Sequence, residues 1–390
     1  MTVQGKLKLK RPGYYLDKKD KGSNSKKCGI LYPLDKSLAI DKLPLKMTIP
    51  AILKVVKVAT ETDNFNAAAR SLKKCGMNIS TSSIKKAVSI VGKFVEENDF
   101  RKAHNDCLRD KTLINKIQPK DKESHAFYVK VCREDNVGIN LKKEDSVGFS
   151  IMHAVVFSSK SVIWATHGGS HIPYLGKREH LAVLEQAGQS DLNFKTLLKH
   201  LAVKNSFCEC EKIYFFSDGS LLMHKLKEEL FPSAIELMDL DFLREIIISY
   251  LERYFTGTGI NFDRIQRDIF LHLQSGDFEK AYSLIRRIGL RNSPKKERLI
   301  KLLKESEPYI PHGHLLDDNV LSLPFKLAIP LQFELKGMLT VPSKSWSQEM
   351  AQHMLTLKAK RSSGLWEEEV VGPFLDSYHI DRKIVQNLEL

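Results

Sequence analysis

Three aspartates stand where alternating strands and helices could bring carboxylates together. Asp218 follows residues 213–216, an unbroken β-branched and aromatic run that predicts a strand buried on both faces. A helix over residues 221–230 should come next, which would leave Asp218 in the crevice at the strand's carboxyl end. Asp135 follows a second predicted strand, residues 125–131, and Asp317 lies in a turn further along the chain. Carboxylates gathered in this way suit two Mg²⁺ or Mn²⁺ ions, which hold the attacking and leaving oxygens of a phosphoryl displacement.

Each of these acids also has a simpler interpretation. Asp is common in turns and at helix caps whatever the function. The strand context makes Asp218 the most specific of the three. Another short apolar run, residues 235–238, ends at Asp239 and Asp241, so the segment 212–250 predicts a βαβ unit with acids at two strand ends. The histidines in this half of the chain do not have metal-ligand spacing, and we expect core or surface positions for them: His153, His167, His171 and His180.

The charge of the chain indicates a polyanionic partner. It has 61 Lys and Arg against 47 Asp and Glu, for a net charge of +14. Such a surplus favours nucleic acid before a membrane, with a merely soluble basic protein as the alternative. Six cysteines in 390 residues do not predict a disulfide framework, and no apolar run predicts a membrane span or signal peptide. We therefore expect a cytoplasmic protein associated with the nucleoid.

The first hundred residues combine a basic arm with a helical domain. Residues 1–40 are rich in lysine, which is typical of either a phosphate-contacting arm or a solvated tail. Residues 41–98 predict a helix, a second helix over residues 65–74, a glycine turn and a longer helix after a polar cap. This pattern favours a helix-turn-helix, although a three-helix bundle without DNA contacts would have a similar one. The side chains expected to face DNA are Thr81, Ser82, Ser83, Lys85, Lys86 and Lys93.

The remainder predicts an α/β fold, a mixed sheet with a helical insertion. After a polar linker, residues 99–123, the sheet should begin with strands at 125–131, 149–157 and 162–166, the last two joined as a hairpin. We expect the first part of the sheet domain to cover 124–241, the helical insertion 242–308, the last part of the sheet domain 309–375 and a tail 376–390.

Several short motifs occur together in a fixed order. They are Cys28-Gly29 with Tyr32-Pro33-Leu34-Asp35, the segment 79–92, Ser217-Asp218-Gly219 followed by Phe231-Pro232-Ser233-Ala234, the segment 313–320, and Trp346-Ser347 with the helix after it. In this order and spacing the chain resembles bacterial insertion-sequence transposases of the DDE type over most of residues 28–370. The resemblance implies a ribonuclease H-like catalytic domain with a helical insertion, preceded by a zinc ribbon and a helix-turn-helix.

The resemblance also implies an activity. The protein would bind the ends of an insertion sequence and catalyse metal-dependent DNA strand cleavage and strand transfer into target DNA, as a homo-oligomer. Asp135, Asp218 and Asp317 would be the catalytic residues and the ligands of Mg²⁺ or Mn²⁺.

The chain departs from the family pattern at several positions. The other cysteines of the ribbon are absent, and Asp317 takes the place of a glutamate, with Asp318 and Glu334 as alternatives. Asp239-Leu240-Asp241-Phe242 lacks the histidine of the family's Asp-x-x-His. Arg133, rather than Asp135, could occupy the position of the first acid. The alternative function is therefore a catalytically inactive, diverged DNA-binding protein derived from a transposase.

Overall fold

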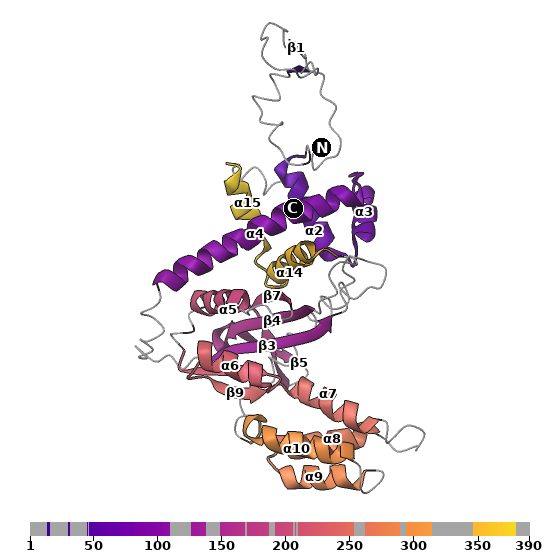
Figure 1. Cartoon of the computed structure of the whole chain (residues 1–390), viewed down its shortest axis with the longest axis vertical. Coiled ribbons are helices and arrows are strands. Elements are labelled where there is room, and N and C mark those ends of the chain that lie inside the picture. Colours follow the sequence, from indigo (N-terminus) through magenta and orange to yellow (C-terminus); the bar gives the residue numbers. More distant parts are fainter. Residues whose placement is uncertain are drawn as a thin grey trace. The chain divides into compact units, whose positions relative to one another are not determined.

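The computed structural model (Figure 1) divides the chain into two compact units. Unit 1 comprises residues 1–97, 346–361 and 365–390, and unit 2 comprises residues 98–345 and 362–364. The structure describes residues 14–15, 30–31, 45, 47–109, 126–137, 149–167, 170–186, 192–205, 207, 210–252, 262–288, 294–313 and 346–379. Within the arm, β1 (Tyr14–Tyr15) and β2 (Ile30–Leu31) form a short antiparallel pair.

Three helices begin unit 1, as the sequence predicts. They are α2 (Ile49–Glu61), α3 (Phe65–Lys74) and α4 (Thr81–Arg109). The Asn64 side chain caps α3 by accepting a hydrogen bond from the Ala67 amide at 2.8 Å, and Ser80 Oγ accepts one from the Ser83 amide at 3.2 Å. The apolar positions at helical spacing are buried in all three helices, among them Ile52, Val55, Val56, Ala68, Leu72, Ile84, Val88 and Val91.

The C-terminal helices complete unit 1. They are α14 (Gln348–Ser362), the π-helical turn η8 (Trp366–Val371) and α15 (Gly372–Ser377). Lys358 Nζ and Arg361 Nη1 both donate to the Thr60 carbonyl oxygen near the end of α2, at 2.9 and 2.8 Å. Carbonyls at a helix C-terminus lack intrahelical donors, so these two cations satisfy one of them. We expected residues 309–375 to belong to the sheet domain. The structure instead assigns residues 346–361 and 365–375 to unit 1, because α14 packs with the N-terminal helices.

Unit 2 contains a five-stranded mixed sheet (Figure 1). Its strands are β3 (Ala126–Val137), β4 (Phe149–Ser158), β7 (Glu179–Gln186), β8 (Lys212–Ser217) and β9 (Ile235–Met238), in the order β7-β4-β3-β8-β9. β3, β4 and β7 are successively antiparallel, whereas β8 and β9 run parallel to β3. This confirms the predicted α/β class and the predicted βαβ unit around Asp218.

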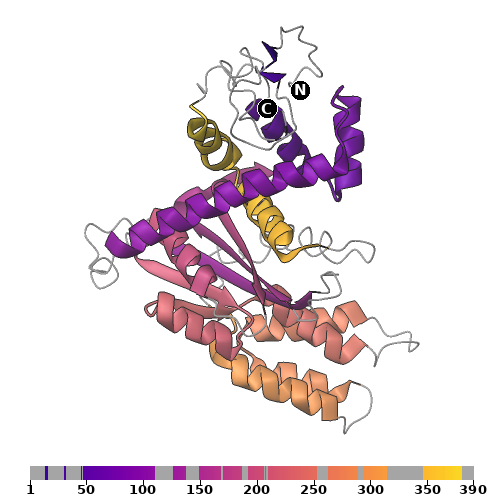
Figure 2. The same cartoon turned by 45° about the horizontal axis from the view of Figure 1, so that its top comes forward.

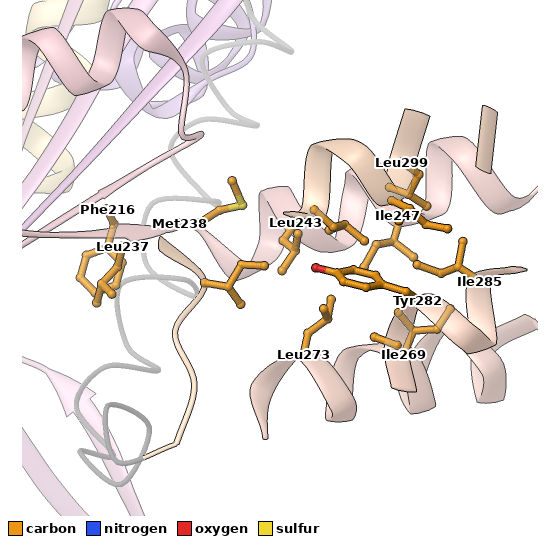
Figure 3. Packing of buried hydrophobic residues seen from close by; sticks show 14 of the residues in the cluster. Phe216, Leu237, Met238, Leu243, Ile247, Ile269, Leu273, Tyr282, Ile285 and Leu299 are labelled. Atoms are coloured by element: carbon orange, nitrogen blue, oxygen red, sulfur yellow. The ribbon is translucent and has the colours of Figure 1, made fainter. Parts of the chain in front are cut away.

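The two faces of this sheet contribute to separate apolar cores, because successive side chains of a strand point to opposite faces. Phe127, Val129 and Phe215 belong to one core, with α5 (Leu192–Lys204) and α6 (Leu221–Leu230). Tyr128 and Phe216 belong to the other, which the helical insertion shares (Figure 3). The insertion consists of α7 (Leu240–Leu251), α8 (Phe262–Gln274), α9 (Phe278–Arg287) and α10 (Pro294–Ser306), followed by η6 (Glu307–Tyr309), so the region expected to be a helical insertion is helical where the structure describes it.

Three elements differ from the sequence predictions. The helix α4 continues to Arg109 (Figure 2), through the first part of the expected linker, because Ala103 and Phe100 pack against the core while their polar neighbours lie on the other side of the helix. β3 extends to Val137 instead of ending near residue 131. β5 (Val162–His167) pairs with β6 (Ser170–Leu175), not with β4, since the 3₁₀ turn η3 (Ser159–Ser161) separates β4 from β5.

Candidate functional site

Asp218 lies at the carboxyl end of β8, in a tight turn that leads into α6. Its Oδ1 accepts a hydrogen bond from the Ser220 amide at 2.9 Å, and Ser217 Oγ accepts one from the Gly219 amide at 3.1 Å. Gly219 has φ +72°, a left-handed backbone conformation that favours glycine. Asp218 is half-buried. The residue therefore holds the strand-end position that the sequence predicts, and one of its oxygens also stabilises the turn.

The pairing of β8 with its two neighbours shows what lies near Asp218. Lys130 is level with Phe216, the last paired position of β3 and β8. On the other side of β8, Ser217 pairs with Met238, so Asp239 follows the neighbouring strand next to Asp218. Asp135 lies five residues beyond Lys130 along β3, a displacement of about 16 Å at about 3.3 Å per residue. The β3–β4 register also shifts between Glu134 and Val137, next to Asp135.

The side chains of the other predicted catalytic acids all lie outside the described part of the structure. The backbone of Asp135 lies within β3, but its side chain is outside the described part of the structure, as is that of Asp241. Asp317, Asp318 and Glu334 also lie outside the described residues. Of the three predicted catalytic acids, the structure thus describes the side chain of Asp218.

A buried ion pair occupies the sheet next to this turn. The ammonium of Lys130 contacts the carboxylate of Asp239, and their side chains are 2% and 8% exposed. Asp239 follows β9, where its amide donates to the Ser217 carbonyl at 2.8 Å and its Oδ1 accepts from the Phe242 amide at 3.4 Å. The carboxylate is therefore neutralised by a fixed cation and by the N-terminal turn of α7. Sequence reasoning missed Lys130, and the signal was a charged residue inside an otherwise apolar strand.

Arg133 lies on the opposite face of β3 from Lys130 and Cys132, because the two faces alternate along the strand. Its Nη2 donates to Ser150 Oγ at 3.4 Å. Arg133 is consequently not the cation beside Asp239, and Lys130 has that role.

Two stacked histidines lie on the Lys130 face of the sheet. The rings of His153 and His180 are 5.5 Å apart, and His153 Nε2 is 3.2 Å from His180 Nδ1. Arg178 Nε donates to His180 Nε2 at 3.1 Å, so His180 carries its proton on Nδ1 and donates to His153 Nε2. His153 then carries its proton on Nδ1, a buried atom without a hydrogen-bond partner.

Both histidines are neutral in the folded protein. Burial, followed by the charge of Lys130, lowers the pKa of His153 to about 3. Burial, followed by His153 and Arg178, lowers the pKa of His180 to about 2. Of the core and surface positions expected for these residues, His153 and His180 occupy core positions. The side chains of His167 and His171 lie outside the described residues.

The described residues at this edge do not fit a two-metal site. Mg²⁺ and Mn²⁺ prefer carboxylate oxygens. Here the carboxylate of Asp239, which follows the strand beside Asp218, faces an ammonium group. Within the described ranges, no three His, Cys, Asp or Glu side chains are grouped so that they could hold a metal ion.

The polar start of α4 is the second candidate site. Of the six residues predicted to face DNA, Ser82, Lys85, Lys86 and Lys93 are exposed and Thr81 and Ser83 are half-buried, while Ile84, Val88 and Val91 are buried between them. Ser80 Oγ lies 2.9 Å from Ser82 Oγ and 3.0 Å from Ser83 Oγ. Lys85 Nζ lies 5.7 Å from the centre of the Phe65 ring, and Lys93 pairs with Glu97 at 3.9 Å. The predicted division of α4 into a packed and a polar face is thus confirmed.

None of the helices in the described part is long and apolar enough to span a membrane. A scan against protein-family models gives no match to this chain, and a search of curated proteins gives none either.

Proposed function

We propose that the chain is a diverged, transposase-derived protein that binds duplex DNA through α4 without cleaving it. The main observation in its favour is the buried ion pair beside the Asp218 turn, where the ammonium of Lys130 neutralises Asp239, the carboxylate that follows the neighbouring strand. A polynucleotidyl transfer site of the DDE type requires acids that share metal ions. A carboxylate that is already paired with a fixed cation favours binding over catalysis.

The fold supports descent from a transposase. A ribonuclease H-like sheet has three antiparallel strands followed by two strands parallel to the first, which is the arrangement of β3, β4, β7, β8 and β9. The insertion of α7–α10 after the fifth strand also agrees with the expected interruption of such a domain. We therefore include the ribonuclease H-like assignment in the proposal.

The DNA-binding part of the proposal depends on α3 and α4. A short helix, a turn and a longer helix with a polar N-terminal half are the parts of a helix-turn-helix, whose second helix enters the major groove. Lys85 and Lys86 are exposed on this second helix, and the exposed Arg70, Lys73 and Lys74 extend the basic surface along α3. These cations would contact phosphates, and the serines at the start of α4 would contact base edges or phosphates.

The test is binding of the full chain to a pool of random 30-base-pair duplexes at several salt concentrations. We expect the logarithm of the association constant to fall linearly with the logarithm of salt concentration, and we expect Lys85→Gln with Lys86→Gln to reduce that slope by roughly 2. The matched control is Lys295→Gln with Lys301→Gln, which removes the same charge from exposed positions of α10. An equal loss of affinity in both double variants would contradict recognition by α4.

A second candidate function is the active enzyme, a transposase acting on element ends with Mg²⁺ or Mn²⁺. Asp218 favours it, because this half-exposed acid stands at the carboxyl end of a central parallel strand. The test is a strand-transfer assay on the inverted repeats that flank the gene, with and without divalent metal. Metal-dependent cleavage that disappears in Asp218→Ala would establish the enzyme, whereas a wild type as inactive as Asp218→Ala would leave binding as the function.

Two further properties belong to the same proposal. Binding of two element ends implies a homo-oligomer, which sedimentation of the protein with and without duplex DNA would test. A DNA partner also implies a cytoplasmic, nucleoid-associated protein, which co-purification with bacterial chromosomal DNA would test.

A further inference from the structure

The hairpin of β5 and β6 stands apart from the five-stranded sheet and exposes large apolar side chains. β5 pairs with β6, and these two strands form their own two-stranded sheet. Ile163 is 60% exposed and Trp164 is 44% exposed on β5. Both belong to the small set of large apolar side chains that are exposed in the described part of the chain, and neighbouring exposed apolar residues can form a binding surface.

The charge around Trp164 indicates what would cover it. The segment 158–178 contains Lys160, Lys177 and Arg178 but neither Asp nor Glu. Lys160 and Lys177 are exposed at the two ends of the hairpin, and the Gly176 amide donates to the Ser161 carbonyl at 2.8 Å, which ties these ends together. The two exposed lysines lie at the base of an acid-free hairpin and Trp164 lies further out on β5, an arrangement that complements an anionic partner that also carries flat apolar rings.

We infer that the β5–β6 hairpin binds single-stranded or unpaired DNA, with the Trp164 indole stacked on a base and Lys160 and Lys177 near the phosphates. Single-strand binding sites combine positive charge with aromatic side chains in this way, because each base has an accessible π face once it leaves the duplex. A base inside a duplex has both faces covered by its neighbours, so the indole selects unpaired nucleotides. The inference extends the proposed DNA binding to a second surface and does not require α4 to function.

Tryptophan fluorescence offers a direct test. The chain has three tryptophans, and Trp346 and Trp366 are buried, with 4% and 6% exposure. Solvent-exposed emission of the full chain therefore reports on Trp164. Titration with a 12-nucleotide oligothymidine should quench this emission at saturation, while a 12-base-pair duplex at the same concentration should not. Absence of quenching by the single strand would overturn the inference.

Variants of Trp164 and Ile163 distinguish stacking on the indole ring from the loss of any exposed apolar side chain. Trp164→Ala should weaken binding of a labelled oligothymidine about ten-fold, and Trp164→Phe should weaken it less, because phenylalanine retains a ring that stacks. Ile163→Ala, which shortens the more exposed neighbour, should leave the affinity within about two-fold. Equal losses in Trp164→Ala and Ile163→Ala would overturn stacking, and so would an equal loss of duplex and single-strand affinity in Trp164→Ala.

The same experiment separates this inference from the proposed function. Lys85→Gln with Lys86→Gln should weaken duplex binding and leave the quenching by single strands unchanged. A wild-type protein that fails to bind duplexes but shows the quenching would contradict the α4 proposal and support the hairpin. Emission that changes with protein concentration in the absence of DNA would show that a second copy of the chain covers Trp164, and it would overturn the inference.

Discussion

The ion pair between Lys130 and Asp239 lies buried beside the Asp218 turn. Both side chains are almost completely buried, one in the middle strand β3 and the other at the start of α7. Removing one partner leaves an uncompensated charge in the interior, which costs far more than the pair contributes when complete. Because Lys130 lies in β3 and Asp239 follows β9, the ion pair joins the middle strand of the sheet to the end of its edge strand.

We predict that Lys130→Met destabilises the protein by about 3–5 kcal/mol, because Asp239 then remains buried without its cation. The double variant Lys130→Met with Asp239→Asn should be less destabilised, since no unpaired charge is left. Urea unfolding of the single and double variants measures both free energies. A double variant as unstable as the single one would show that the ion pair itself is not the source of the loss.

The histidine pair makes stability depend on pH. His153 and His180 have pKa values near 3 and near 2 in the folded protein, whereas an unfolded histidine titrates near 6.5. As the pH falls below about 6.5 the unfolded chain gains protons that the folded chain cannot accept, so the stability present above that pH is progressively lost toward pH 3. Each histidine contributes a slope of up to about 1.4 kcal/mol per pH unit.

His180→Gln should reduce this slope between pH 4 and pH 6.5. The glutamine amide oxygen can still accept from Arg178, and the side chain no longer titrates. Denaturant unfolding across this pH range, compared with wild type and with His379→Gln at an exposed position, measures the difference. A slope unchanged from wild type would mean that His180 does not titrate on unfolding as its burial implies.

At the level of elements, α4 and α14 approach closely within unit 1. A Cβ on Gly92 of α4 would lie 2.4 Å from His353 Cβ and 3.1 Å from His353 Cα. The absence of a side chain at Gly92 is what lets these two helices pack, and the sequence alone suggested only a glycine within a helical pattern.

We predict that Gly92→Ala destabilises unit 1 by about 1–3 kcal/mol, although alanine is the better helix former by about 1 kcal/mol. The backbone of α14 has to move to accept the methyl group, which outweighs the gain in propensity. Thermal unfolding followed by circular dichroism measures the change. Ser89→Ala at a half-buried position of the same helix serves as control and should change stability by less than about 0.5 kcal/mol.

On the scale of the whole molecule, unit 1 is assembled from both ends of the chain. Lys358 and Arg361 donate to Thr60, 298 and 301 residues earlier, and Met354, Leu355 and Leu357 of α14 are buried. The packing of the N-terminal helices therefore involves C-terminal residues, which are synthesised last.

We predict that a chain ending at residue 345 loses the cooperative folding of α2–α4 and binds duplex DNA at least ten-fold more weakly. Truncation exposes the apolar surfaces that α14 covers and leaves the Thr60 carbonyl without these donors. Hydrogen exchange of the α2 amides measures the loss of structure, with a chain ending at residue 379 as control. Full protection of α2 in the shorter chain would show that the N-terminal helices fold independently.

Local patterns were sufficient to predict many of the elements. The bounds of α3, the strand before Asp218 and the helical character of the insertion follow from apolar periodicity and from caps such as Asn64, which are properties of neighbouring residues. The sequence left open whether His153 and His180 are in the core or on the surface, and the structure places both in the core.

The tertiary structure decided which residues meet. Sequence patterns placed Asp135 at a strand end, but β3 continues to Val137, because the extent of a strand is set by pairing across the sheet rather than along the chain. The partner of Asp239 is likewise a lysine 109 residues earlier, which no local spacing predicts. The strand and turn that present Asp218 follow from neighbouring residues, because they depend on local hydrophobicity and turn chemistry. The neighbouring carboxylate, Asp239, and its buried partner Lys130 come from two other strands, so their pairing is a property of the folded sheet.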